Sequence, residues 1–230
     1  ERALVRLARQ LGQPQPGKAK AIAPTRLDLC LPRPDAYSVE FAVKAHLSEP
    51  EGPVHYVENS LICSLFGLLC WEAIFAPLPG AFFHPFHTGP VDLFSADFHP
   101  RRAELFAACL AHLDSDAYKQ VIRQRYADKF GIQSSFVFWG ALDQALLEQA
   151  LDCLPAAHLR AWFKRLLLDI KANRAGMPDL IQFWPAEQRY RMIEVKGPGD
   201  RLQDNQRRWL AFCAEHGMPV DVCYVQWADA

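Results

Sequence analysis

Several common functional signatures are absent from this sequence. Its 230 residues contain no CxxC pair, and none of the seven cysteines shows the spacing of a zinc site. There is also no P-loop and no GxGxxG, GxSxG or HExxH motif, so neither nucleotide hydrolysis nor zinc proteolysis is supported. An excess of one charge is missing too, because 25 Lys and Arg stand against 26 Asp and Glu, which gives 25 − 26 = −1. That balance excludes a polycation that packs chromatin, yet it permits a local basic face.

Targeting and membrane segments are the next absence. No secretory signal is visible, and the longest apolar run, 61–79, is interrupted by Glu72 and by prolines before it reaches the roughly 20 residues of a membrane span. We therefore expect an intracellular protein with reduced thiols and no membrane partner. No eukaryotic appendage is visible, which favours the bacterial cytoplasm (nucleoid), and the nucleus is expected if the source is eukaryotic. The chain starts at Glu1 without a methionine, so we interpret it as the C-terminal part of a longer protein.

The residue pattern, and with it the predicted secondary structure, changes along the chain. Leu4, Leu7 and Leu11 predict a short helix over 1–12, which a Pro-rich stretch at 13–18 follows, so residues 1–20 are interpreted as a helical tail and linker from a missing upstream domain. Residues 21–230 are expected to form one domain. Apolar periodicity predicts a buried helix over 59–75 and helices over 101–113, 116–130, 140–153, 156–173 and 200–215.

Strands are expected mainly near the end of the chain. Two strands, 179–184 and 190–195, are separated by a turn, and a third follows at 220–226. Residues 25–48 mix prolines with alternating segments such as 38–43, which predicts irregular structure with short edge strands, and 77–100 predicts a long irregular loop. The fold class is therefore α/β, with a mixed β-sheet flanked by helices and an N-terminal helical and irregular extension.

Acidic residues and one lysine flank the first two of these strands. Asp179 opens one strand, while Glu194 and Lys196 close the other and point to the same face because they are two residues apart. A hairpin would bring Asp179 beside them. Two carboxylates that share a site are costly without a cation, and hard oxygen ligands suit Mg²⁺ or Mn²⁺. Metal-assisted hydrolysis of a phosphodiester is one interpretation, and a solvated Glu194–Lys196 pair at a strand end is the other.

Gln206 lies on the inward face of the predicted helix over 200–215. Its neighbours on that face are Leu202, Trp209, Leu210 and Cys213, so an amide stands where an apolar residue would be ordinary. A buried amide needs partners. It faces either the metal site and the scissile strand or a backbone group of the core.

Three segments together resemble a known family. They are Gly176-Met177-Pro178-Asp179-Leu180, the run from Glu194 to Leu202 (EVKGPGDRL), and Gln206-Arg207-Arg208-Trp209-Leu210. This pattern resembles the C-terminal VRR-NUC domain of the Fanconi-associated nuclease family, in the PD-(D/E)xK nuclease superfamily. The segments 54–59 and 65–72 resemble the buried helix of the same family, and the resemblance extends from about residue 20 to the C-terminus.

The resemblance implies a restriction-endonuclease-like fold and a structure-selective DNA nuclease. The family cuts 5′ flaps and related branched DNA, digests DNA from 5′ to 3′, serves in interstrand crosslink repair, and uses Mg²⁺ or Mn²⁺. Carried over by position, the metal ligands are Glu58, Asp179, Glu194 and the Val195 carbonyl, the catalytic lysine is Lys196, and Gln206 matches the helix glutamine. Upstream DNA-binding and helical-repeat regions of the same protein are further expected partners.

Glu58 also has a rationale from the sequence alone. It precedes the predicted buried helix, and a carboxylate at a helix N-terminus is stabilised by about 0.3–1 kcal/mol, whether or not it binds metal. Glu72, inside that helix, is the competing acid, and a salt-bridged helix residue is its simpler interpretation.

Basic residues flank the acidic constellation. Lys171 and Arg174 lead into Asp179, and Arg201 and Arg207 lie on the other side, so all four are candidate phosphate contacts. A solvated helix face is the alternative for each.

The irregular loop is rich in aromatic residues. Phe82, Phe83, Phe86 and Phe94 would either stack unpaired bases or form a small core of the loop itself. His84 and His87 lie three residues apart but lack the helical frame of a metal site.

Two rival functions remain at this point. One is a non-catalytic DNA-binding domain on the same fold, and the presence of Asp179, Glu194 and Lys196 together argues against it. The other is a Holliday-junction resolvase, which is typically a small stand-alone dimer, whereas the long helical segments here favour a monomeric flap nuclease.

Overall fold

The computed structural model describes residues 10–12, 24–33 and 38–228. The predicted helix over 1–12 and the linker over 13–18 therefore lie outside the described residues, apart from 10–12.

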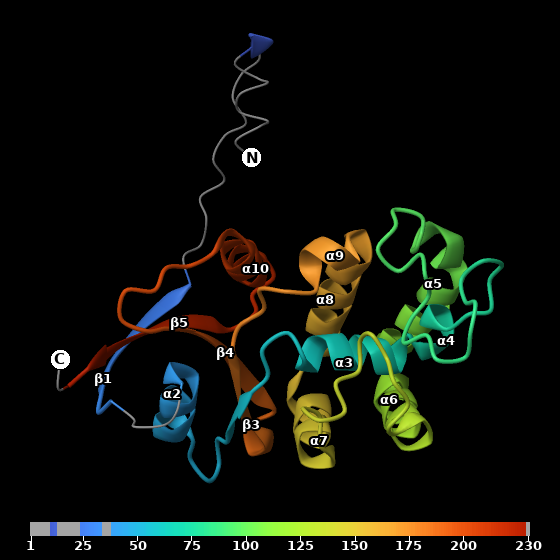
Figure 1. The fold of residues 1–230 in the computed structure, drawn as a ribbon. Helices are drawn as coiled ribbons and strands as arrows, with labels where there is room; N and C mark the ends of the chain where they lie inside the picture. Colours follow the sequence, from blue (N-terminus) through green and yellow to red (C-terminus); the bar gives the residue numbers. More distant parts are fainter. Residues whose placement is uncertain (1–9, 13–23, 34–37, 229–230) are drawn as a thin grey trace.

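A five-stranded mixed sheet forms one side of the molecule (Figure 1). Its order is β1-β5-β4-β3-β2, with parallel pairing of β1 with β5 and of β5 with β4, and antiparallel pairing of β4 with β3 and of β3 with β2. The three predicted strands are confirmed. The strands are β1 (Thr25–Leu31), β2 (Val54–Tyr56), β3 (Leu180–Trp184), β4 (Arg189–Lys196) and β5 (Val220–Trp227).

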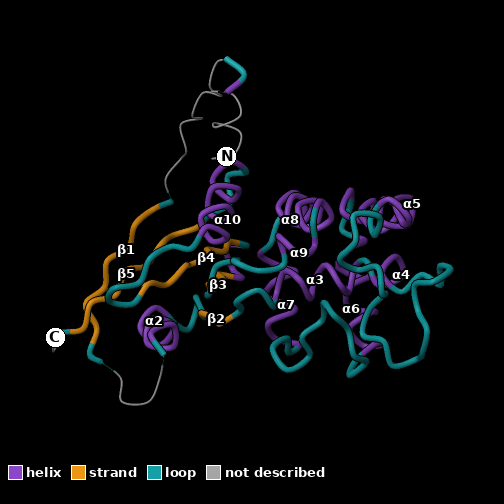
Figure 2. The backbone as a smooth tube through the Cα atoms, turned by 45° about the horizontal axis from the view of Figure 1, so that its top comes forward, coloured by secondary structure: helices purple, strands orange, loops and turns teal. Residues whose placement is uncertain are grey.

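Helices surround the sheet and extend away from it on one side. In Figure 2 the orange strands occupy one half of the molecule and most of the purple helices the other. Within the described residues, no helix combines the length and the apolar character that crossing a membrane requires. The helices are α2 (Val39–Leu47), α3 (Leu61–Leu69), α4 (Trp71–Ile74), α5 (Ala103–Ala111), α6 (Ala117–Lys129), α7 (Gln144–Cys153), α8 (Ala156–Leu168), α9 (Ile170–Asn173) and α10 (Asp204–Glu215).

The two faces of the sheet belong to different cores. Val43 of α2 packs with Leu180, Ile193 and Val195 in a small cluster on one face. The residues between them, such as Ile181 and Met192, join the larger core that includes α3, α8 and α10. Because successive side chains of a strand alternate between faces, β3 and β4 are buried on both sides. This explains why β3 is a nearly continuous apolar run.

The segment 38–43 is a helix, so the edge strand expected there is wrong. Its alternating Val39, Phe41 and Val43 fit a strand, but positions 39, 43 and 47 are also spaced by four, as on one face of a helix. Val43 is fully buried in the small core, whereas Phe41 is 43% exposed. The helical spacing therefore decides the outcome. The edge strand of this region is instead β1, which pairs in parallel with β5 over seven residues.

The buried helix that was predicted over 59–75 is α3 with α4. All nine residues of α3 are buried, because apolar side chains cover the helix on every side. The helix predicted over 156–173 is interrupted at Asp169, whose extended backbone ends α8. The Asp169 carboxylate accepts a hydrogen bond of 2.9 Å from the Ala172 N–H and so caps α9.

Gly176 allows the chain to turn from α9 into β3. Its φ is +93°, and a Cβ at this position would lie 2.8 Å from the side chain of Asn205 on α10. We expect Gly176→Ala to lower the free energy of unfolding by about 1–3 kcal/mol, because the variant adds backbone strain and displaces Asn205. Urea unfolding measures this. Gly80→Ala is the matched control, since Gly80 also has a positive φ but no atom near its Cβ. Equal losses in the two variants would show that Asn205 contributes nothing.

Candidate functional site

The acidic residues predicted from the sequence meet where three neighbouring strands end. In the register of β3 with β4, Leu180 pairs with Ile193, so Asp179 stands opposite Glu194. On the other side, the N–H of Val57 donates to the carbonyl of Asp179 at 2.9 Å, which places Glu58 one residue further along. The hairpin therefore brings Asp179 and Glu194 together as predicted, with Glu58 beside them.

Asp179 is a buried carboxylate that the backbone holds in place. Its Oδ2 accepts a hydrogen bond of 2.8 Å from the N–H of Val195, and the residue is 8% exposed. Burial raises the pKa of Asp179 to about 6, against the lowering effects of that hydrogen bond and of Lys196. The group is thus less acidic than an ordinary aspartate.

Glu194 and Lys196 form a buried ion pair. The Glu194 side chain is fully buried, and its Oε1 lies 2.7 Å from Nζ of Lys196, whose side chain is 9% exposed. Neither carboxylate oxygen of Glu194 accepts a hydrogen bond of ordinary geometry. Burial, followed by the charge of Asp179, raises the pKa of Glu194 to about 7, against the lowering effect of Lys196. The alternative of a solvated Glu194–Lys196 pair is therefore wrong.

Glu58 lies at the exposed rim of the site. It accepts hydrogen bonds from the hydroxyl of Tyr56 and, at 3.2 Å, from the amide of Asn59. Asn59 has a φ of +54°, and its Oδ1 accepts from the N–H of Met177 at 3.1 Å, which ties the start of α3 to the approach to β3. The local turn thus directs Glu58 toward the acidic residues, and its charge raises the pKa of both Asp179 and Glu194.

Glu40 is a further acid that the sequence did not indicate. It lies in the first turn of α2, and its charge also raises the pKa of Asp179. Glu40 could have been found only by recognising from the apolar spacing that α2 is a helix. The charges of Glu40 and Glu58 thus act on Asp179, and those of Asp179 and Glu58 act on Glu194, beside the ammonium of Lys196.

The chemistry of these groups fits a hard divalent cation. Glu194 offers two buried oxygens without an ordinary hydrogen bond, and the negative charge around it exceeds that of the one lysine. In the part of the chain that the structure describes, however, no three His, Cys, Asp or Glu side chains form a group that could hold a metal ion as they stand. An ion would therefore have to compete with Lys196 for Glu194, and with Tyr56 and Asn59 for Glu58.

Gln206 is used within its own helix. Its Oε1 accepts a hydrogen bond of 2.9 Å from the N–H of Gln203, and the Gln203 side chain accepts from the backbone of Gln206, which forms a capping box at the start of α10. The structure thus gives Gln206 a backbone partner. Its role in the reaction stays a prediction.

The four basic candidates differ in how they are held. Lys171 and Arg201 are exposed. Arg207 donates from Nε to the carbonyl of Leu202 at 3.0 Å, and Arg174 donates to the carbonyl of Ser135 at 3.0 Å. Hydrogen bonds to backbone carbonyls therefore fix the guanidinium groups of Arg207 and Arg174. Contact with DNA phosphates stays a prediction for all four.

The raised pKa of Asp179 predicts how stability depends on pH. A carboxyl whose folded pKa lies above its unfolded value stabilises the fold fully below the unfolded pKa of 3.8, and this contribution is lost as the pH rises through about 6. Between pH 4 and pH 8 the wild type should therefore lose stability relative to Asp179→Asn, by at most about 3 kcal/mol. Urea unfolding in the presence of a chelator measures the difference. Parallel stability profiles of the two proteins would contradict the assignment.

A mixed sheet with Asp179 opposite Glu194, and with Lys196 two residues later, defines the PD-(D/E)xK class of nuclease domains. The VRR-NUC domain family matches residues 113–227, which include Asp179, Glu194 and Lys196 but not Glu58. The chain belongs to the VRR-NUC family.

Relatives resemble most of the chain. The Fanconi-associated nuclease 1 homolog of Pseudomonas aeruginosa is 67% identical over 227 residues, which are 98% of this chain and 41% of the relative. Human Fanconi-associated nuclease 1 is 33% identical over 176 residues, which are 73% of this chain and 17% of the human protein. The crystal structure of paFAN1 bound to DNA with a 2-nucleotide 5′ flap and a gap matches with a TM-score of 0.90 and 67% identity, over 98% of this chain and 42% of paFAN1. The chain thus spans less than half the length of these relatives.

Proposed function

We propose that the protein is a divalent-metal-dependent deoxyribonuclease that hydrolyses phosphodiester bonds in 5′-flap and related branched DNA. The observation that carries this proposal is the fully buried Glu194 beside Asp179, whose Oε1 pairs with the Lys196 ammonium at 2.7 Å while its Oε2 has no hydrogen-bond partner among the described residues. Membership of the VRR-NUC family and the flap DNA bound by paFAN1 support it. Endonucleolytic cutting of 5′ flaps, 5′-to-3′ digestion and a role in interstrand crosslink repair are parts of the same proposal.

The residues that would hold the cation are Glu58, Asp179, Glu194 and the Val195 carbonyl. When bound, Mg²⁺ or Mn²⁺ would neutralise charge on the phosphate and make water a better nucleophile. The protein fixes the donors in advance, since the Val195 N–H holds Asp179 and the sheet register sets Asp179 against Glu194. Burial excludes water from Glu194 and strengthens every charge interaction there.

Lys196 is the residue proposed to act on the reacting groups. Its ammonium can donate hydrogen bonds to an attacking water and to a phosphate oxygen, so it orients the first and stabilises negative charge on the second. The ion pair with Glu194 keeps Nζ at the strand end, where the two residues share one face of β4. Gln206 would support this arrangement by fixing the start of α10.

The wider setting completes the proposal. Lys171, Arg174, Arg201 and Arg207 would contact phosphates on either side of the cleaved bond. We place the protein in the bacterial cytoplasm, as a monomer in which residues 21–230 form the nuclease domain and upstream regions of the same protein grip the duplex and the flap end.

A cleavage assay on a panel of labelled DNAs tests the proposed function. With Mg²⁺ or Mn²⁺, 5′-flap duplexes should be cut faster than blunt duplexes and four-way junctions, and a chelator should stop the reaction. Preferential cutting of the four-way junction would instead indicate a resolvase. Binding to the flap without cutting in either metal would indicate a non-catalytic DNA-binding domain.

A further inference from the structure

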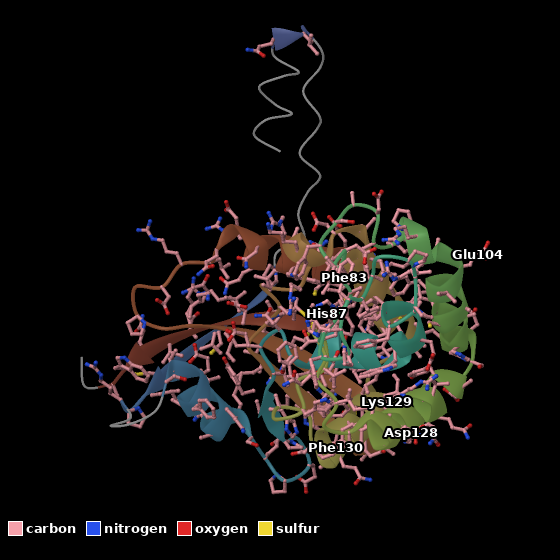
Figure 3. All side chains as sticks on the ribbon, turned by 45° about the vertical axis from the view of Figure 1, so that its right-hand side comes forward. Phe83, His87, Glu104, Asp128, Lys129 and Phe130 are labelled. Carbon is pink, nitrogen blue, oxygen red and sulfur yellow. The ribbon has the colours of Figure 1, made fainter. Side chains whose placement is uncertain are left out.

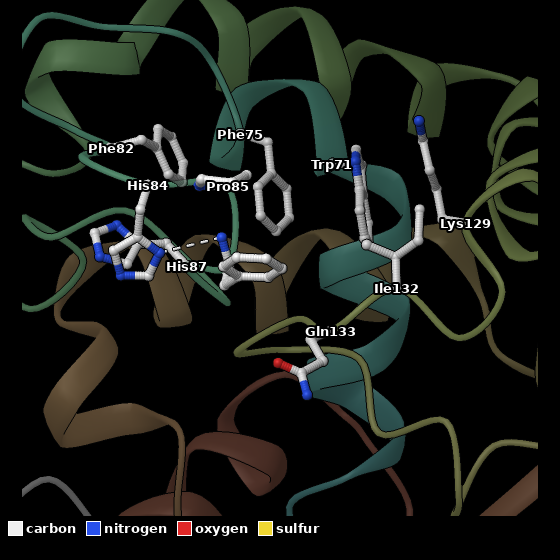
Figure 4. Close-up of a pocket in the computed structure, with 10 residues that line it drawn as sticks. Trp71, Phe75, Phe82, His84, Pro85, His87, Lys129, Ile132 and Gln133 are labelled. Atoms are coloured by element: carbon white, nitrogen blue, oxygen red, sulfur yellow. Dashed lines mark hydrogen bonds between the residues drawn. The ribbon is translucent and has the colours of Figure 1, made fainter.

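A cavity lies apart from the acidic residues, at the far end of α3, the helix that follows Glu58. Its volume is about 680 Å³, and its walls come from α4, from the irregular loop between α4 and α5, and from the end of α6 with the residues that follow (Figure 4). The proposed nuclease chemistry makes no use of it. Its lining residues are Trp71, Phe75, Phe82, His84, Pro85, Phe86, His87, Lys129, Ile132 and Gln133.

Stacked aromatic rings form one wall of this cavity. The rings of Trp71 and Phe75 lie 4.5 Å apart with an angle of 27° between their planes. Phe75 and Phe82 follow at 6.0 Å and 17°. Flat rings in a nearly parallel series provide a surface on which another flat ring can stack.

Phenylalanines of the loop remain open to solvent. Phe86, which lines the cavity, is 82% exposed, and Phe83, which does not, is 74% exposed. Figure 3 shows the loop side chain of Phe83 near His87, on the side of the molecule that also carries Lys129. These phenylalanines therefore do not form a core of the loop, which was one of the two alternatives from the sequence.

Every ionisable residue that lines the cavity is basic. Nζ of Lys129 lies 5.8 Å from the ring of Trp71, and the imidazoles of His84 and His87 lie with their centroids 3.7 Å apart. No carboxylate is among the lining residues. Aromatic rings beside the Lys129 ammonium suit a ligand that combines a flat ring with negative charge, and a nucleotide of a single strand has both.

We propose that this cavity binds a base of an unpaired DNA strand, with Lys129 beside the adjoining phosphate. The inference rests on the proposed function and deepens it, since it identifies this cavity as the binding site for the distal nucleotides of a 5′ flap.

The geometry sets how long the unpaired strand must be. Glu58 and Trp71 stand on either side of α3, and a helix rises 1.5 Å per residue, so their separation is roughly 15–20 Å. A stacked strand rises about 3.4 Å per nucleotide, so about five stacked nucleotides would reach from the acidic residues to the cavity. The loop is also tied to the acidic end, because Thr88 hydrogen-bonds Ser135 at 3.1 Å and the Ser135 carbonyl accepts from Arg174.

The test compares flap duplexes that carry one or six unpaired thymidines. Affinities of the fluorescein-labelled DNAs are measured by anisotropy with a chelator present, for the wild type, Phe86→Ala and Phe83→Ala. Phe83→Ala is the matched control, because it removes a similarly exposed phenylalanine of the same loop that does not line the cavity. A six-nucleotide flap of abasic residues, bound to the wild type, separates base stacking from phosphate contacts without any mutation.

The wild type and Phe83→Ala are expected to bind the six-nucleotide flap roughly tenfold more tightly than the one-nucleotide flap. Phe86→Ala and the abasic flap should each lose this advantage. If the affinity of Phe86→Ala depended on flap length as much as that of the wild type, the inference would be overturned. The same result is expected if a protein segment, and not DNA, occupies the cavity. Cutting of the one-nucleotide flap in Mg²⁺ is scored separately. If the one-nucleotide flap were not cut but the effect of flap length on affinity persisted, the proposed nuclease activity would be rejected and the proposed binding of the unpaired strand would stand.

Discussion

Replacing Glu194 by glutamine is expected to lower the rate of flap cutting on the order of 1000-fold while the affinity for DNA persists. The substitution keeps the size of the side chain and removes its charge. Glu194 is the most buried acid of the site, and both of its oxygens lack ordinary hydrogen bonds. An amide offers only one oxygen, without a full negative charge, so it would hold the proposed cation far more weakly.

Single-turnover rates with saturating Mg²⁺ measure this effect. Glu187→Gln is the matched control, because Glu187 belongs to the same hairpin but is 58% exposed and pairs with Arg189. It should cut at the wild-type rate. If Glu194→Gln also retained that rate, the proposed role of Glu194 would be wrong.

Replacing Lys196 by methionine should lower turnover by roughly 100- to 1000-fold without preventing Mn²⁺ binding. Methionine matches lysine up to Cε and removes the ammonium, which among the described residues is the one cation paired with Glu194. Loss of this ion pair frees the Glu194 carboxylate, so metal affinity should be maintained or increased. Loss of turnover with retained Mn²⁺ binding therefore distinguishes a residue that acts on the reacting groups from one that binds the metal.

Rates and Mn²⁺ affinity, measured on the same preparation, distinguish the two roles. Lys164→Met on α8 is the control, since Lys164 is exposed and remote in sequence from the hairpin. A Lys196→Met protein that lost Mn²⁺ binding together with activity would show that Lys196 merely supports the site structure.

The hairpin that carries the site was predictable because its signals are local. β3 is a short apolar run, β4 mixes apolar and charged residues on the other side of a turn, and Glu194 and Lys196 share a face by the alternation of any strand. The register that sets Asp179 opposite Glu194 follows from the short turn between the strands. The buried character of α3 was likewise visible in its own residues.

Other features depend on contacts between distant segments, which no local pattern contains. α2 was taken for a strand because Val39, Phe41 and Val43 satisfy both periodicities, and only packing against the sheet selects the helix. The missed acid Glu40 follows from the same error. The parallel pairing of β1 with β5 joins segments almost 200 residues apart.

The hydrogen-bond partners and the exposure of individual side chains also could not be predicted from the sequence. The amide of Gln206 was expected either near the metal or on a backbone group, and the capping box with Gln203 shows which backbone group it contacts. The exposure of Phe83 and Phe86 could not be read from a loop that lacks any periodicity.

The central claim is that Glu58, Asp179 and Glu194 together bind a hard divalent cation beside Lys196. Anomalous diffraction from crystals of the protein grown with Mn²⁺ tests it most directly. We expect an anomalous peak within bonding distance of the Asp179 and Glu194 carboxylates and the Val195 carbonyl, and no such peak in Glu194→Gln crystals. Wild-type crystals that show no manganese between these carboxylates at millimolar Mn²⁺, or that show it only elsewhere, would contradict the account.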